Sequence, residues 1–267
     1  MDERIKNILG EIRTLTETAF DGLVGIYIHG SLAFGCFTWE RSDIDYLAVL
    51  RASPTHEGKR KYIEGLLEIN ERAPSKGIEM SVVLLRDTLC PKHPIPYELH
   101  FSNAHRDAYR EDIDGYINKL KGNDPDLSAH FAVTRAVGYA LCGETIHDVF
   151  GEVRREDYLD SILCDIKNAA ADIRNNPVYV TLNLCRAAAY AENGAVLSKA
   201  DGAKWAKNTL PTQFMPIADA AYKAYVYGEK FDITDGLTDF ARYMLGRFNL
   251  NLKINKHVKN DTNGVKF

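Results

Sequence analysis

The chain has 267 residues, 45% of them hydrophobic, and a formal net charge of -4 at pH 7. That length accommodates one large or two ordinary globular domains, and the hydrophobic content argues against extensive disorder. Because Lys and Arg are not in excess, the chain is poorly suited to neutralise a long phosphate backbone, and nucleic acid is not an expected partner.

The sequence also shows no membrane-spanning segment, signal peptide or paired cysteines. No stretch approaches the roughly 18 consecutive apolar residues that span a bilayer, and the first residues lack the apolar core of a signal peptide. Five dispersed cysteines without a C-x-x-C pair argue against a disulfide framework and against a structural zinc site. We therefore expect a cytoplasmic protein without a membrane partner.

The first 85 residues alternate between helical and strand-like patterns. Apolar residues at helical spacing predict helices over 2–20 and 57–72. Short apolar runs predict strands over 23–29, 44–50 and 78–85, with a turn over 30–42. This order indicates an α+β domain with a mixed sheet and flanking helices, to which we assign residues 1–122.

After the proline-rich loop at 91–96 the pattern changes, and from residue 124 onward it shows only helical periodicity. The pattern predicts helices over 124–142, 156–174, 178–192, 198–208, 211–227 and 234–252. Residues 123–255 are therefore expected to form an all-α helical-bundle domain. The polar residues 256–267 are expected to form a flexible tail.

Three acidic residues stand out in the predicted strands. Asp43 and Asp45 point to the same side of a strand, about 7 Å apart along the chain. Glu79 interrupts an apolar alternation, and a buried carboxylate needs a partner. A hard divalent cation shared by the three carboxylates accounts for both observations. Two alternatives stay open, namely solvated aspartates that cap a loop and a glutamate at the exposed start of an edge strand.

Gly30 and Ser31 directly follow the first predicted strand. Glycine lets the backbone approach a ligand closely, and Ser31 with its neighbouring N–H groups offers hydrogen bonds to phosphate oxygens. A Gly-Ser pair is equally typical of a structural turn. P-loop, G-x-G-x-x-G, G-x-S-x-G and H-E-x-x-H motifs are absent from the sequence. The pattern that remains is a Gly-Ser loop beside a carboxylate triad.

These motifs resemble those of a known superfamily. His29-Gly30-Ser31, followed by Asp43-Ile44-Asp45 and later by Glu79, resembles the nucleotidyltransferase fold of the DNA polymerase β superfamily. The helical half resembles the C-terminal domain of aminoglycoside adenylyltransferases of the streptomycin/spectinomycin (AadA-like) type, and the matching stretches are 97–101, 124–127, 179–186 and 198–211. The resemblance covers roughly residues 20 to 250.

The resemblance implies magnesium-dependent transfer of AMP from ATP to a hydroxyl of an aminocyclitol or aminoglycoside antibiotic, spectinomycin and/or streptomycin, which confers resistance. It implies that Asp43, Asp45 and Glu79 hold two Mg²⁺ ions and that Glu79 is the catalytic base. The implied ATP contacts are Gly30, Ser31, Ser42, Asp126, Lys199 and Tyr225, the last three from the helical domain. The expected partners are thus ATP and a small cationic drug, bound by a monomer.

Departures from the family pattern concern the drug. Where streptomycin-modifying relatives carry tryptophans, this chain has Ala104 and Lys167. Asn176 replaces an acidic residue, and Asp172 is a candidate for another acidic drug contact. Two further hypotheses remain: a nucleotidyltransferase that acts on another small molecule or a protein, and a non-catalytic nucleotide-binding protein of the same fold.

Overall fold

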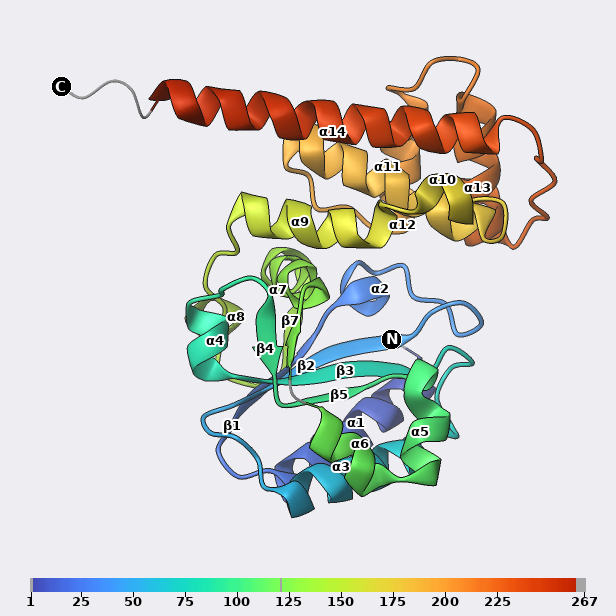
Figure 1. Ribbon diagram of the computed structural model, residues 1–267. Helices are drawn as coiled ribbons and strands as arrows, with labels where there is room; N and C mark the ends of the chain where they lie inside the picture. The colour runs from blue at the N-terminus through green and yellow to red at the C-terminus, as the bar shows by residue number, and fades with distance from the viewer. Residues whose placement is uncertain (1, 121, 263–267) are drawn as a thin grey trace. The chain divides into compact units, whose positions relative to one another are not determined.

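A computed structural model describes residues 2–120 and 122–262 and shows an α+β unit and a helical unit (Figure 1). The chain divides into these two compact units between Tyr158 and Leu159. This confirms the predicted fold class, an α+β unit with a mixed sheet followed by a helical unit. In the described part of the chain, no helix has both the length and the apolar composition needed to cross a membrane.

The first unit alternates helices and strands along the chain. Its helical elements are α1 (Glu3–Ala19), α2 (Gly30–Ala33), α3 (His56–Asn70), α4 (Leu85–Leu89), the 3₁₀ turn η1 (Asn103–His105), α5 (Arg106–Glu111), α6 (Ile113–Lys119), α7 (Asp126–Val137) and α8 (Ile146–Val149). Its strands are β1 (Leu23–Ile28), β2 (Ile44–Leu50), β3 (Ile78–Leu84), β4 (Ile95–Tyr97), β5 (Leu99–Phe101), β6 (Gly122–Asp124) and β7 (Tyr139–Gly143).

Five of these strands form one mixed sheet in the order β5-β3-β2-β1-β7. The central strands β2 and β3 are parallel, and the other neighbours are antiparallel. Parallel neighbours need a crossover connection, which α3 supplies. The parallel register places Asp45 opposite Glu79. Strands β4 and β6 pair separately as a two-stranded ribbon.

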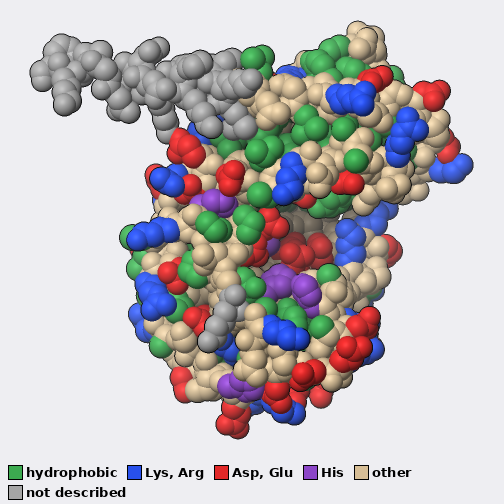
Figure 2. All heavy atoms as spheres, viewed as in Figure 1, with side chains coloured by type: hydrophobic (Ala, Val, Ile, Leu, Met, Phe, Trp, Pro, Cys, Tyr) green, Lys and Arg blue, Asp and Glu red, His purple; other side chains and the backbone are tan. Residues whose placement is uncertain are grey.

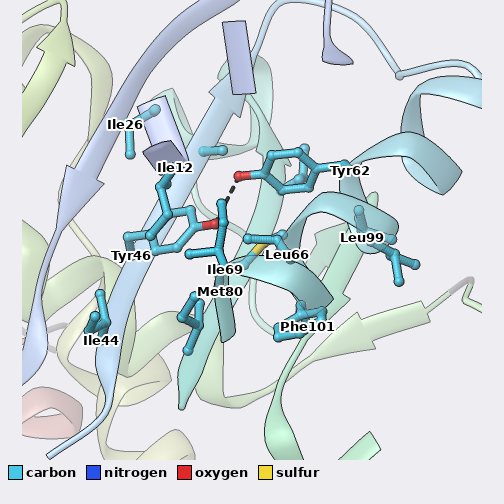
Figure 3. Close-up of a cluster of buried hydrophobic side chains, with 14 of the residues drawn as sticks. Ile12, Ile26, Ile44, Tyr46, Tyr62, Leu66, Ile69, Met80, Leu99 and Phe101 are labelled. Carbon is cyan, nitrogen blue, oxygen red and sulfur yellow. Dashed lines mark hydrogen bonds between the residues drawn. The ribbon is translucent and has the colours of Figure 1, made fainter. Parts of the chain in front are cut away.

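One face of the sheet packs against α1 and α3. Its core contains even-numbered side chains of β2 and β3, such as Tyr46 and Met80, because alternate residues of a strand share a face. Tyr46 and Tyr62 are fully buried there, and their hydroxyls are 2.8 Å apart (Figure 3). The Tyr62 hydroxyl also lies 2.8 Å from that of Thr16 on α1, so a chain of hydrogen bonds runs through this apolar layer.

The opposite face packs against α7 and α8. Leu47 and Val83 from the sheet share a core with Leu127 and Phe131 of α7. Asp45 and Glu79 have odd numbers, as do Leu47 and Val83, and so they lie on this same face. Apolar packing thus fills most of the face and leaves the N-terminal ends of β2 and β3 to the acidic residues.

The second unit is helical throughout its described part. Its elements are α9 (Arg155–Ile166, which begins before the division), α10 (Ala169–Asp172), α11 (Pro177–Asn193), α12 (Lys199–Lys207), α13 (Met215–Tyr227) and α14 (Leu237–Thr262). Small buried residues such as Ala188 on α11 let the neighbouring helices approach closely around the core. Ser198 caps α12 by accepting the Asp201 N–H at 3.0 Å.

Three predicted elements differ from the structure. The helix predicted over 124–142 ends at Val137, and β7 follows it because residues 139–143 pair with β1. Residues 123–158 consequently lie in the first unit, whereas the sequence-based boundary was placed at 122. The helix predicted over 156–174 is divided into α9 and α10. Helix α14 continues to position 262, into the predicted tail, and residues 263–267 lie outside the described part.

Candidate active site

Three carboxylates converge at the N-terminal ends of the parallel strands. Asp43 immediately precedes β2, Asp45 lies on β2 and Glu79 lies on β3. One carboxylate oxygen from each lies within 4.8 Å of the others, and all three side chains are half-buried. The structure therefore brings together the three acids that the sequence singled out.

Gly30 makes room for one of these carboxylates. Its φ is +58°, in the left-handed region that favours glycine. A Cβ atom at this position would lie 1.9 Å from Oδ2 of Asp45, far inside van der Waals contact. The N–H of His29 also donates to the Asp45 backbone carbonyl at 3.1 Å. The Gly-Ser loop is thus built closely around the acidic cluster.

The environment of Glu79 opposes its ionisation. Burial is the largest cause that raises the pKa of its carboxyl, and the nearby negative charges of Asp43, Asp126 and Asp124 add to the effect, while His130 acts in the opposite direction. Because β3 lies between β2 and β5, Glu79 is not on an edge strand. The alternative of an exposed edge glutamate is therefore wrong.

The residues present fit a divalent cation. Carboxylate oxygens are the ligands that Mg²⁺ prefers, and a cation between them would relieve the mutual repulsion of the three charges. Figure 2 shows acidic side chains next to histidine side chains on the visible face of the first unit. The three acids are accordingly the candidate metal ligands of the described chain.

Two serines flank the carboxylates. Ser31, in α2, has a buried Oγ atom that makes no hydrogen bond with the described residues. A buried hydroxyl without a partner is costly, and an oxygen-rich anion would supply one. Ser42 is buried, and its Oγ accepts the Thr38 N–H at 3.0 Å, which braces the loop before β2. Only Ser31 thus has the features of an unfilled ligand contact.

The remaining predicted ATP contacts are distributed over both units. Asp126 begins α7 in the first unit, where its N–H donates to Asp124 Oδ1 at 2.8 Å and its charge acts on Glu79. Lys199 begins α12 in the second unit, with its Nζ 4.7 Å from the centre of the Tyr179 ring. Tyr225 on α13 packs at the edge of a small apolar cluster. The roles of these residues toward ATP stay predictions.

The second unit contains a cavity of about 310 Å³ that is lined by both polar and apolar side chains. Asp165 holds its wall together by accepting the Asn183 Nδ2–H at 3.0 Å and the Tyr179 hydroxyl at 3.3 Å. Asn183 is 3% exposed, and its Oδ1 makes no hydrogen bond with the described residues. Asp172 and Asn176 also line the cavity. Acidic and amide oxygens of this kind suit a ligand that carries ammonium and hydroxyl groups.

Sequence reasoning missed the histidines around the cluster. His130 on α7 lies with its ring centre 4.8 Å from that of the buried His29. His100 on β5 stands opposite Ser81 of β3. A lone histidine carries no local signal, and only the packing of α7 and the register of β5 bring these two rings to the acidic face.

Comparison with known proteins agrees with the sequence resemblance. Residues 148–247 match the family described as the aminoglycoside adenylyltransferase C-terminal domain. An aminoglycoside (3'') (9) adenylyltransferase from Escherichia coli is 26% identical over 233 residues, which cover 84% of this chain and 87% of the relative. One from Klebsiella pneumoniae is 26% identical over 232 residues, with the same coverage.

A solved structure matches most of the chain. It is that of spectinomycin adenyltransferase AAD(9) from Enterococcus faecialis with ATP and spectinomycin, with a TM-score of 0.77 and 18% sequence identity. The match covers 91% of this chain and 99% of the other, so the two proteins share a fold. Over most of its length the chain is thus similar to aminoglycoside adenylyltransferases, and it shares the fold of a spectinomycin adenyltransferase.

Proposed function

We propose that this protein transfers AMP from ATP to a hydroxyl of an aminocyclitol or aminoglycoside antibiotic and thereby confers resistance. The observation that carries the proposal is the convergence of Asp43, Asp45 and Glu79 within 4.8 Å beside the Gly30 loop. Phosphoryl and nucleotidyl transfer depend on charge neutralisation and positioning, and a divalent cation held by such a cluster would supply both.

Asp43, Asp45 and Glu79 would hold the divalent cation, which neutralises triphosphate charge when bound. Glu79 accepts the proton of the acceptor hydroxyl, whose oxygen forms a bond to the α-phosphorus of ATP as the bond to pyrophosphate breaks. The products are an AMP ester and pyrophosphate. Burial and acidic neighbours raise the pKa of Glu79, which makes its ionised carboxylate a stronger base than an exposed one.

The Gly-Ser loop would hold the triphosphate. Ser31 offers a hydroxyl that has no hydrogen-bond partner among the described residues, and the absence of a side chain at Gly30 lets the loop lie against Asp45. We assign Ser42, Asp126, Lys199 and Tyr225 to ATP contacts as well, on the strength of the family resemblance.

The cavity of the second unit supports a cationic acceptor. Asp165 and Asp172 supply negative charge at its wall, and a compact aminocyclitol fits a volume of about 310 Å³. Ala104 and Lys167 replace the tryptophans of streptomycin-modifying relatives. These replacements favour spectinomycin over streptomycin as the first acceptor to test.

The test is pyrophosphate release with ATP, Mg²⁺ and either spectinomycin or streptomycin. We expect release with at least one drug, loss of release in the Glu79→Gln variant, and ATP binding retained in that variant. Glu57→Gln, at an exposed position in the first turn of α3, is the matched control. ATP binding without pyrophosphate release in the wild-type protein would contradict the proposal and favour a non-catalytic nucleotide-binding protein.

Release with some other hydroxyl compound, but with neither drug, would favour the alternative of a different small-molecule or protein acceptor. Cells that express the chain should show resistance to the drug that is modified. The monomeric state and the cytoplasmic location remain predictions, which sedimentation and cell fractionation would test.

A further inference from the structure

His100 lies one diagonal step from the candidate catalytic base. The antiparallel register pairs Ser81 of β3 with His100 of β5. Ser81 follows Glu79 by two positions on the same strand, so the two side chains share a face. Diagonal neighbours on adjacent strands are separated by about 7–8 Å, so that one ligand can contact both a histidine and a glutamate placed in this way.

Ser81 orients the imidazole ring. Its Oγ lies 3.0 Å from Nδ1 of His100, and Ser81 is only 2% exposed. Among the described residues this nitrogen is the one hydrogen-bond partner of the Ser81 hydroxyl. Because a buried hydroxyl proton without an acceptor is costly, the Ser81 O–H donates to Nδ1. The ring is then the tautomer that carries its proton on Nε2, and this N–H makes no hydrogen bond within the described part of the chain.

Neighbouring rings hold His100 in a partly buried, uncharged state. Its ring centre lies 5.8 Å from that of His105 and 6.3 Å from that of Tyr97. Burial is the main cause that lowers the pKa of His100 to about 4, with contributions from His130 and His105 in the same direction and from Asp124 in the opposite one. At neutral pH the imidazole therefore offers an uncharged N–H beside an acidic cluster.

We propose that His100 is a specificity-determining residue whose Nε2–H donates a hydrogen bond to an acceptor oxygen adjacent to the hydroxyl that reacts. This inference rests on the proposed function. Glu79 would accept the proton of the reacting hydroxyl, while His100, a diagonal step away, binds the neighbouring oxygen. The substrate class that satisfies both contacts is a ring with vicinal oxygen substituents, one of them a hydroxyl.

Ser81 is in this view a positioning residue. Its hydrogen bond selects the tautomer, and loss of that bond would let His100 present either a donor or an acceptor at Nε2. The uncharged ring would also not repel a cationic acceptor.

The test compares wild-type protein with His100→Ala and His100→Gln in AMP transfer to spectinomycin and to streptomycin. We expect His100→Ala to lower kcat/KM for the drug that is modified roughly three- to tenfold, the loss typical of one uncharged hydrogen bond. The KM for ATP should stay within about twofold, since His100 acts on the acceptor. His100→Gln, whose amide N–H can donate, should recover part of the loss. His147→Ala, at an exposed position of α8, is the control.

A second readout does not depend on turnover. Nitrogen NMR of the imidazole should show a neutral ring protonated at Nε2 in the wild type at pH 7, and a mixture of tautomers in Ser81→Ala. A ring protonated at Nδ1, or charged at both nitrogens, would overturn the inference, even if an alanine variant failed to fold. Unchanged kcat/KM in His100→Ala would overturn this inference alone. Absence of AMP transfer to either drug by the wild type would overturn the proposed function and this inference with it.

Discussion

Gly30 and Asp45 lie so close together that the Asp45 carboxylate leaves no room for a side chain at position 30. A Cβ on Gly30 would stand 1.9 Å from Asp45 Oδ2, and the φ of +58° at Gly30 already disfavours any residue with a side chain. The loop after β1 and the carboxylate on β2 therefore form one unit. Displacement of either should disturb both the candidate metal site and the candidate phosphate site.

Gly30→Ala is accordingly expected to lower kcat/KM at least about 100-fold, because misplacement of reacting groups by about 1 Å has effects of that size. Gly35→Ala is the matched control: its φ is +70°, but no atom lies within 4 Å of a Cβ at that position. Both variants carry the cost of a left-handed alanine, about 1–2 kcal/mol. Thermal melts of the two variants measure the backbone strain that they share, and steady-state kinetics measure the additional effect of the collision between the new Cβ at position 30 and Asp45. Equal losses of activity in Gly30→Ala and Gly35→Ala would contradict an effect of the collision.

The stability of the protein should depend on Mg²⁺ and on pH together. Burial and the charges of Asp43, Asp126 and Asp124 raise the pKa of Glu79 in the folded state. Because the pKa of Glu79 is higher in the folded than in the unfolded state, protonation of this carboxyl favours the folded state. That contribution to the free energy of unfolding is lost as the pH rises through the pKa of the folded state. Ionised Glu79 thus destabilises the metal-free protein near neutral pH. Mg²⁺ should raise Tm by a few degrees at pH 8 and much less at pH 5.

The Glu79→Gln variant provides the complementary measurement. Without Mg²⁺ at pH 8 it should melt at a higher temperature than the wild type, because the repulsion among the carboxylates is reduced, and its response to Mg²⁺ should be weak. Glu57→Gln should behave as the wild type in both respects. An equal Mg²⁺ effect at both pH values, or an undiminished effect in Glu79→Gln, would contradict the assignment of Glu79 as a ligand.

The buried hydroxyl chain beneath the sheet has a direction. Thr16 Oγ donates to the Ile12 carbonyl at 2.7 Å, so it must accept from Tyr62, and Tyr62 must accept from Tyr46. Tyr46→Phe removes the end of this chain and should cost about 0.5–1.5 kcal/mol of unfolding free energy. Tyr62→Phe leaves the Tyr46 proton unpaired and should cost about 1–3 kcal/mol. Urea denaturation distinguishes the two, and the reverse order would disprove the assigned direction.

Alanine variants of Ser31 and Ser42 should differ in their effects on ATP affinity and on thermal stability. Ser31→Ala removes a buried oxygen that bonds to no described residue, so Tm should not fall. Its affinity for ATP should fall roughly 10- to 150-fold, the loss expected of a hydrogen bond to a charged phosphate. Ser42→Ala breaks the bond to the Thr38 N–H and should lower Tm as well. Calorimetric titration with ATP measures the first effect, and unchanged affinity in Ser31→Ala would exclude the phosphate contact.

Local sequence patterns were sufficient to predict most helices and the three strands β1, β2 and β3. The apolar runs of β1, β2 and β3 lie within one residue of their predicted bounds, because strands buried on both faces are nearly continuous apolar segments. Strand β7 was predicted as the end of a helix. Residues 139–143 become a strand because they pair with β1, more than a hundred positions earlier, and no local pattern encodes such a partner.

The acidic cluster could be predicted because it violates the local pattern. Asp45 and Glu79 interrupt strands that are otherwise apolar, and a sequence tolerates such a conflict mainly at functional sites. The sequence by itself thus determined which three acids form the cluster, the Gly-Ser loop beside it and the helical second half. Only the tertiary structure decided that α7 belongs to the first unit and that His100, oriented by Ser81, stands diagonally from Glu79. The physical reason is that strand register and helix packing join residues distant in the chain, whereas periodicity reports only on neighbours.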